Sequence, residues 1–123
     1  MRKQYFFRQS PRGLLAWDVD RLVALTSSFP RRQVPLSTIR ELDEAWHGDD
    51  ESPTWRSLLP HLELIDAADL AYPIILAADG SVMDGRHRVM RALRERRSHI
   101  EAVQFTVDPE PDHVGRRPED LEY

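Results

Sequence analysis

Cysteine is missing from the 123-residue chain. Its absence excludes disulfide scaffolds, zinc sites built on thiolates, iron–sulfur clusters and cysteine nucleophiles. The sequence also lacks any apolar run close to the ~20 residues that cross a bilayer, and residues 1–13 lack the apolar stretch of a signal peptide. We therefore expect a soluble, cytoplasmic protein that has no membrane partner.

An excess of basic charge is missing as well. Of 17 basic and 21 acidic residues, two and six fall in the last sixteen positions, 108–123, which leaves fifteen of each in the rest of the chain. A neutral body is unlike the basic surface of a duplex-binding domain. What the chain does contain is 41% hydrophobic and 31% charged residues. This balance and the length predict one globular domain.

One helix is predicted early in the chain. Asp18 is a suitable N-cap, and Pro30 follows the segment that it opens, so we expect a helix that ends near Ser27. Its inner side is expected to carry three apolar residues, namely Leu22, Val23 and Leu25.

The residues on either side of this helix are less regular. Residues 33–36 are predicted to be extended, and Pro35 within them indicates an edge strand or the start of a strand. Ser37 is expected to cap a short helical turn that runs through Trp46. Residues 1–13 are basic and aromatic and end with Pro11 and Gly13, and the sequence leaves open whether they are ordered.

A longer helix is predicted over residues 54–70, because its apolar residues recur at helical spacing. These residues are Leu58, Leu62, Ile65 and Leu70. Pro60 removes a backbone donor from the helix interior, so we expect a break there or a late start near His61.

The second half of the chain predicts a hairpin, a helix and a closing strand. The expected strands are residues 73–77, 81–84 and 100–107, and the first two are joined by a two-residue turn at Asp79-Gly80. A helix over 86–97 is expected to pack through Val89, Met90, Ala92 and Leu93. We predict a single α+β domain with one mixed sheet and packed helices.

One segment carries chemistry. Asp84-Gly85-Arg86-His87-Arg88 stands where a strand gives way to a helix. The glycine allows a tight turn, and the first helical turn presents unpaired N–H groups and the positive end of the helix dipole. Such a junction binds anions. The simpler interpretation is a turn glycine followed by the exposed face of an arginine-rich helix.

The stretch from Tyr72 to Phe105 resembles the core of the ParB/sulfiredoxin-like superfamily, and residues 34–40 are similar to the strand and turn that precede this core. The resemblance implies a small ParB/sulfiredoxin-like fold. It divides the chain into an N-terminal segment and helix (1–32), a ParB-like core (33–107) and an acidic, proline-rich tail (108–123).

Two activities of that superfamily are not expected here. Sulfiredoxins carry a catalytic cysteine where this chain has Arg86. Partition ParB proteins add a DNA-reading helix-turn-helix and a dimerisation domain, for which the sixteen residues after Val107 are too few. Sequence-specific DNA binding is therefore not expected from this chain alone. The resemblance still implies a site for a nucleotide (ATP, CTP or ADP) with Mg²⁺.

The loop is also similar to the Asp-Gly-His-His-Arg loop of ParB-like free-serine kinases, from which it differs at one position. The resemblance implies that the phosphates are bound by Gly85, Arg86, His87 and Arg88, with Arg40 as a secondary ligand. It implies catalytic roles for Asp84 and for one carboxylate among Glu41, Asp43 and Glu44, of which Glu41 is our candidate.

Several functions stay open. The chain is predicted to be a nucleotide- or phosphate-binding domain, either a small-molecule kinase or nucleotide hydrolase, or a non-enzymatic adaptor or DNA-partition-related binding protein. A nuclease that uses the arginine-rich helix is a further alternative, against which the neutral body argues. Trp46 and Trp55 flank an acidic loop, as residues of a lid would. In that loop, His47 and its acidic neighbours suggest a solvated segment more than a metal site.

Overall fold

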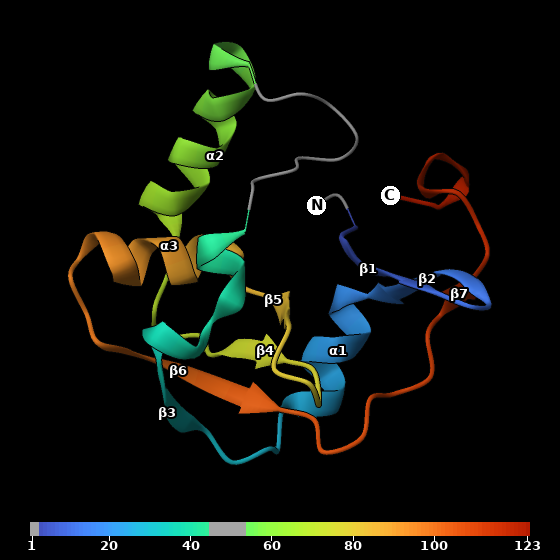
Figure 1. Cartoon of the computed structure of the whole chain (residues 1–123), viewed down its shortest axis with the longest axis horizontal. Helices are drawn as coiled ribbons and strands as arrows, with labels where there is room; N and C mark the ends of the chain where they lie inside the picture. The colour runs from blue at the N-terminus through green and yellow to red at the C-terminus, as the bar shows by residue number, and fades with distance from the viewer. Residues whose placement is uncertain (1–2, 45–53) are drawn as a thin grey trace.

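The computed structural model describes residues 3–44 and 54–123, which form an α+β fold with two sheets and three α-helices (Figure 1). This confirms the predicted class. In chain order the elements are β1 (Tyr5–Ser10), β2 (Gly13–Asp18), α1 (Val19–Thr26), β3 (Arg32–Pro35), η1 (Leu36–Thr38), η2 (Arg40–Asp43), α2 (Trp55–Ala67), β4 (Ile74–Leu76), β5 (Val82–Asp84), α3 (Arg86–Arg94), β6 (His99–Gln104), β7 (His113–Val114) and η3 (Pro118–Asp120).

The larger sheet has four strands in the order β3-β6-β4-β5. β4 runs parallel to β6, whereas β3–β6 and β4–β5 are antiparallel, so the sheet is mixed as predicted. Its strands fall in the four segments that the sequence predicts to be extended. β3 lies at an edge and ends at Pro35, which agrees with the position of the proline.

Strand β4 separates two hydrophobic cores. Ile74 and Leu76 point to the side covered by α3, where they cluster with Val89. Ile75 points to the opposite side and clusters with Trp17 of β2 and Leu22 of α1. All three residues of the strand are buried, because both faces of the sheet are covered.

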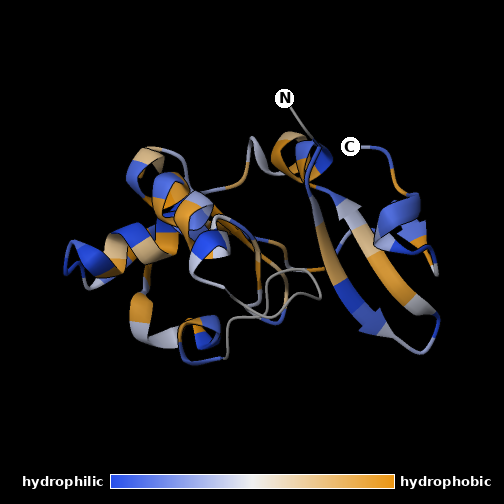
Figure 2. Ribbon diagram, turned by 90° about the horizontal axis from the view of Figure 1, so that it is seen from above, coloured by the Kyte–Doolittle hydropathy of each residue, from blue (hydrophilic) through white to orange (hydrophobic). Residues whose placement is uncertain are grey.

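A second, three-stranded sheet was not predicted. β1 and β2 form a hairpin, and β7 from the acidic tail pairs with β2. This sheet lies at one end of the molecule, and α2 and α3 lie at the other (Figures 1 and 2). The tail is docked along its length: Leu121 is buried, and Trp17 Nε1 donates a hydrogen bond of 2.8 Å to the Pro109 carbonyl.

Helix α1 begins after Asp18, whose side chain accepts a hydrogen bond from the Asp20 N–H, so the predicted cap is confirmed. Its inner side is narrower than predicted. Leu22 is fully buried, whereas Val23 and Leu25 are about half exposed. α1 has eight residues and packs on the core with a narrow face. The buried residues of such a face are spaced by four, here Leu22 and Thr26.

The same correction applies to α3. Val89 and Ala92 are buried, as expected, but Met90 and Leu93 are about half exposed. Helical periodicity identifies an apolar arc, and only the position of the sheet decides which part of that arc is covered.

The prediction of a break at Pro60 is wrong. α2 is continuous over Trp55–Ala67 with the proline in its interior. A capping box holds its first turn: the Thr54 side chain accepts from the Ser57 N–H at 3.0 Å, and the Ser57 side chain accepts from the Thr54 N–H at 2.8 Å. The proline then removes a single backbone bond, the one toward the Arg56 carbonyl.

Two turns also differ from prediction. The β4–β5 loop has three residues, because Ala77 N–H bonds to the Ser81 carbonyl and Gly80 N–H to the Ala77 carbonyl, both at 2.9 Å. Ser37 caps no helical turn, since it lies inside η1, which has no side-chain cap. Trp46 and the acidic loop with His47, including the suggested lid, lie outside the described residues.

The narrow contact line of α1 leads to a stability prediction. Leu22→Ala should lower the free energy of unfolding by about 2–5 kcal/mol, because it opens a cavity in the core. Leu25→Ala, on the exposed side of the same helix, should cost about 0.5 kcal/mol or less. Urea unfolding of both variants measures the difference, and equal losses would contradict the assigned burial.

Candidate functional site

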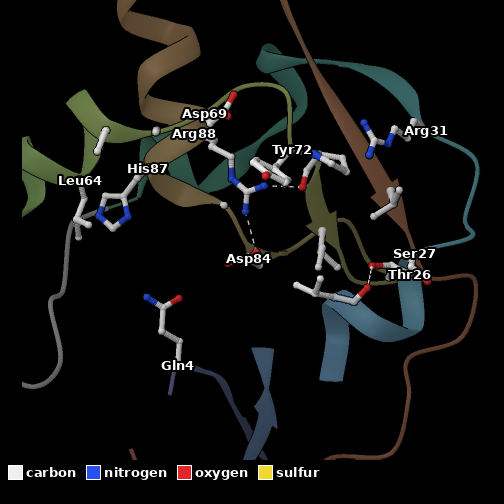
Figure 3. A pocket seen from close by; sticks show the side chains of 17 residues that line it. Gln4, Thr26, Ser27, Arg31, Leu64, Asp69, Tyr72, Asp84, His87 and Arg88 are labelled. Carbon is white, nitrogen blue, oxygen red and sulfur yellow. Dashed lines mark hydrogen bonds and ion pairs between the residues drawn. The ribbon is translucent and has the colours of Figure 1, made fainter. Parts of the chain in front are cut away.

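A cavity of about 570 Å³ opens beside the start of α3. Its walls come from α1, the C-terminal half of α2, the connection from α2 to β4, and the loop between β5 and α3 (Figure 3). Four of the five residues of the predicted loop line it, namely Asp84, Gly85, His87 and Arg88. The volume lies in the usual range for small-molecule sites.

Gly85 allows the chain to enter α3 at this point. It caps the helix in the left-handed conformation, with φ of 108°. A Cβ there would lie 2.6 Å from Ile74 Cγ2, inside the core. The glycine has no side chain to cap the helix, so within the described residues the N–H groups of the first turn, from Arg86 to Arg88, have no capping side chain.

Arg88 joins the two strands next to the cavity. One guanidinium nitrogen donates to the Pro73 carbonyl at 2.7 Å, before β4, and the other donates to Asp84 Oδ2 at 2.7 Å, at the end of β5. Both side chains are mostly buried. The ion pair therefore has a structural role, and two of the five N–H groups of Arg88 are occupied by protein acceptors.

His87 is paired with a second histidine. Its Nε2 lies 3.0 Å from Nδ1 of His61 on α2, and the ring centroids are 5.3 Å apart. Burial lowers the pKa of His87 from 6.5, and the neighbouring His61 and Arg86 lower it further, whereas Asp84 opposes the shift. His87 is therefore neutral at pH 7 and points into the cavity as an imidazole (Figure 3).

The remaining predicted site residues lie elsewhere. The Arg86 side chain is exposed and does not line the cavity. Arg40 lies at the opposite end of β5, where it donates to Ser81 Oγ at 2.9 Å and stands 3.6 Å from Asp79. The structure does not bring it to the loop.

Glu41 also lies away from the cavity. Its Oε2 accepts a hydrogen bond of 2.5 Å from the Val82 N–H, on the exposed edge strand of the sheet. Its Oε1 is buried and has no hydrogen-bond partner among the described residues. The carboxylate thus covers a sheet edge, and neither it nor Asp43 or Glu44 lines the cavity with Asp84.

Sequence reasoning missed the partner histidine and the far wall of the cavity. His61 is 26 residues from His87, and no local pattern links the two. Outside the loop, polar side chains of the cavity wall come from Gln4, Thr26, Ser27, Arg31 and Tyr72. These residues come from three separate segments, so only the tertiary structure brings them together.

No family model, curated protein or solved structure matches this chain. The structure itself contributes one negative finding: within residues 3–44 and 54–123, no helix is long and apolar enough to cross a membrane.

Gly85 provides a prediction about the loop. Gly85→Ala should destabilise the protein by about 2–4 kcal/mol, since it adds backbone strain and a clash with Ile74. Gly80→Ala is the matched control, because Gly80 also has a positive φ, 89°, but open space around its Cβ position; it should cost about 1 kcal/mol. Thermal or urea unfolding compares the two, and an equal cost would show that the clash is absent.

The histidine pair provides a prediction about pH. Because the folded state lowers the pKa of His87, the unfolded chain binds a proton more readily between about pH 7 and pH 5. Stability should therefore fall as the pH is lowered through this window. His87→Gln should flatten that part of the profile, as measured by urea unfolding at several pH values. An unchanged slope in the variant would rule out His87 as the source.

Proposed function

We propose that the chain binds a small molecule that carries a phosphate group, with the phosphate at the start of α3. The observation that carries this proposal is that the uncapped first turn of α3 opens at a cavity of ligand size. Backbone N–H groups and the helix dipole attract an anion there. A nucleotide is the ligand that the resemblance to ParB-like domains favours.

The local charges support an anion of modest charge. With His87 neutral, Arg86 and Arg88 outweigh Asp84, so the loop carries one positive charge in addition to the helix dipole. Farther along the cavity, Arg31 is paired with Glu101 at 3.3 Å, and Asp69 adds a negative charge. We therefore expect affinity to depend on the first phosphate and to rise little with additional phosphates. Mg²⁺ that accompanies a nucleotide would find one carboxylate in the loop, Asp84.

The geometry favours binding over phosphoryl transfer. A kinase needs a group that orients or deprotonates the acceptor near the phosphate. One Asp84 carboxylate oxygen accepts a hydrogen bond from Arg88, and Glu41 binds the edge of the sheet outside the cavity. Among the described residues, the two predicted catalytic carboxylates are therefore not arranged around one site. The non-enzymatic alternative is the one that we propose.

The experiment is a thermal-shift panel of inorganic phosphate, AMP, ADP, ATP, CTP and GTP, each with and without Mg²⁺. A ligand at 100 times its Kd should stabilise the protein by about 2.7 kcal/mol. The matching nucleoside without phosphate should give a clearly smaller shift. If no phosphate compound stabilises the protein, the proposal is wrong, and steady conversion of a nucleotide would support the kinase or hydrolase alternative.

The decisive variant is His87→Glu, which places a negative charge at the first turn of α3 and should weaken phosphate binding at least roughly tenfold, about 1.4 kcal/mol. Met90→Glu is the control: it adds the same charge to the exposed side of the same helix, away from the cavity. Arg88 is unsuitable for this purpose, because its removal also breaks the link between β4 and β5. Equal affinity of the two variants would place the ligand elsewhere.

A further inference from the structure

Within residues 3–44 and 54–123, helix α2 is anchored by its C-terminal half. Its contacts with α3 come from its C-terminal half: Ile65 is buried, His61 meets His87, and Arg94 lies 2.8 Å from Asp66. The N-terminal half extends away from the sheet and from α3 (Figure 1). A helix of this length is only marginally stable in water without tertiary packing. A partner that packs against the uncovered half would therefore stabilise the helix.

An apolar strip begins in the uncovered half of α2 and ends just past His61, at Leu62. Trp55, Leu59 and Leu62 are 90%, 58% and 41% exposed. Their spacings of four and three residues place them on one face of the helix, as in the seam of a coiled coil. We call these three residues the α2 strip.

Charged residues beside the strip indicate what covers it. Arg56 and Glu63 are both exposed and seven residues apart, so they lie on the same flank of the strip, one toward each end. When two copies of a helix pair antiparallel, like flanks meet. Arg56 of one copy then faces Glu63 of the other, and the contact occurs twice. In the same register, Leu59 packs against Leu62 of the second copy.

A parallel arrangement lacks this complementarity. It would place the charged flank against the opposite flank, which carries Leu58 and Ile65. We infer that a second copy of this chain covers the α2 strip, as an antiparallel, two-fold symmetric helix pair. The contact involves one helix of about 20 Å per copy. It is small, so the dimer should dissociate in the micromolar range.

Sedimentation velocity over a range of micromolar concentrations tests the dimer directly. Leu62→Glu should abolish it. The control is Leu25→Glu on α1, where the leucine has the same 41% exposure, and this variant should dimerise normally. Circular dichroism verifies that both variants fold. A monomer at every concentration would overturn the inference and leave the strip to a different partner, and a dimer that survives Leu62→Glu would use another surface.

Charge reversal tests the orientation. Arg56→Glu and Glu63→Arg should each weaken dimerisation roughly tenfold, because each change turns two attractive contacts into two repulsive ones. The double variant Arg56→Glu/Glu63→Arg should restore wild-type association, since the pairs re-form with exchanged signs. Failure of the double variant to recover would overturn the antiparallel arrangement. None of these residues lines the cavity, so the test is independent of ligand binding.

Discussion

The bond network around Arg88 is the interaction on which the rest of the site depends. Its guanidinium reaches the Pro73 carbonyl before β4 and the Asp84 carboxylate at the end of β5, and so holds the open ends of the hairpin together. Gly85 makes this possible, because a side chain at that position would collide with Ile74 and crowd the same guanidinium. The direction of α3, the uncapped first turn and the position of His87 all follow from this junction. The primary role of the loop is therefore structural, because it connects β5 to α3. The proposed anion site results from the geometry of this connection.

Other elements cover both faces of the four-stranded sheet, and this is how so short a chain encloses a cavity. β4 has only three residues, and each is buried against one of two cores. α3 covers one face, and α1 with the hairpin covers the other. The cavity lies beside this sheet, and residues of both α1 and α2 line it. The polar residues of its wall also make contacts that stabilise the fold. Arg31, for example, donates a hydrogen bond to the Ala71 carbonyl.

The parts of the structure that the sequence predicts are those encoded by neighbouring residues. The Asp18 cap, the β4–β5 hairpin and the glycine before α3 each depend on a few adjacent positions. Periodicity predicts three helices, but it assigns Val23 and Met90 to the core, because the arc that is covered depends on what packs there. The His61–His87 contact, the Arg88–Pro73 bond and the edge position of Glu41 join distant segments, and no local pattern specifies them. The loop could thus be recognised as a candidate site, whereas its working partners could not.

The pairing of β2 with β7 has a consequence for how the protein is made. β2 is synthesised before its partner strand, because that strand and the carbonyl that accepts the Trp17 indole hydrogen bond come from residues 109–114, and 92 residues separate Trp17 from Pro109. The Tyr5 hydroxyl likewise bonds to the Glu122 carbonyl. Until residues 109–114 have been made, the β1–β2 hairpin lacks the strand that pairs with β2, and the Trp17 side chain is incompletely covered. The β1–β2 hairpin therefore cannot complete its packing during synthesis before the tail has been made, and a nascent molecule stalled before residue 109 would expose a sheet edge suited to aggregation.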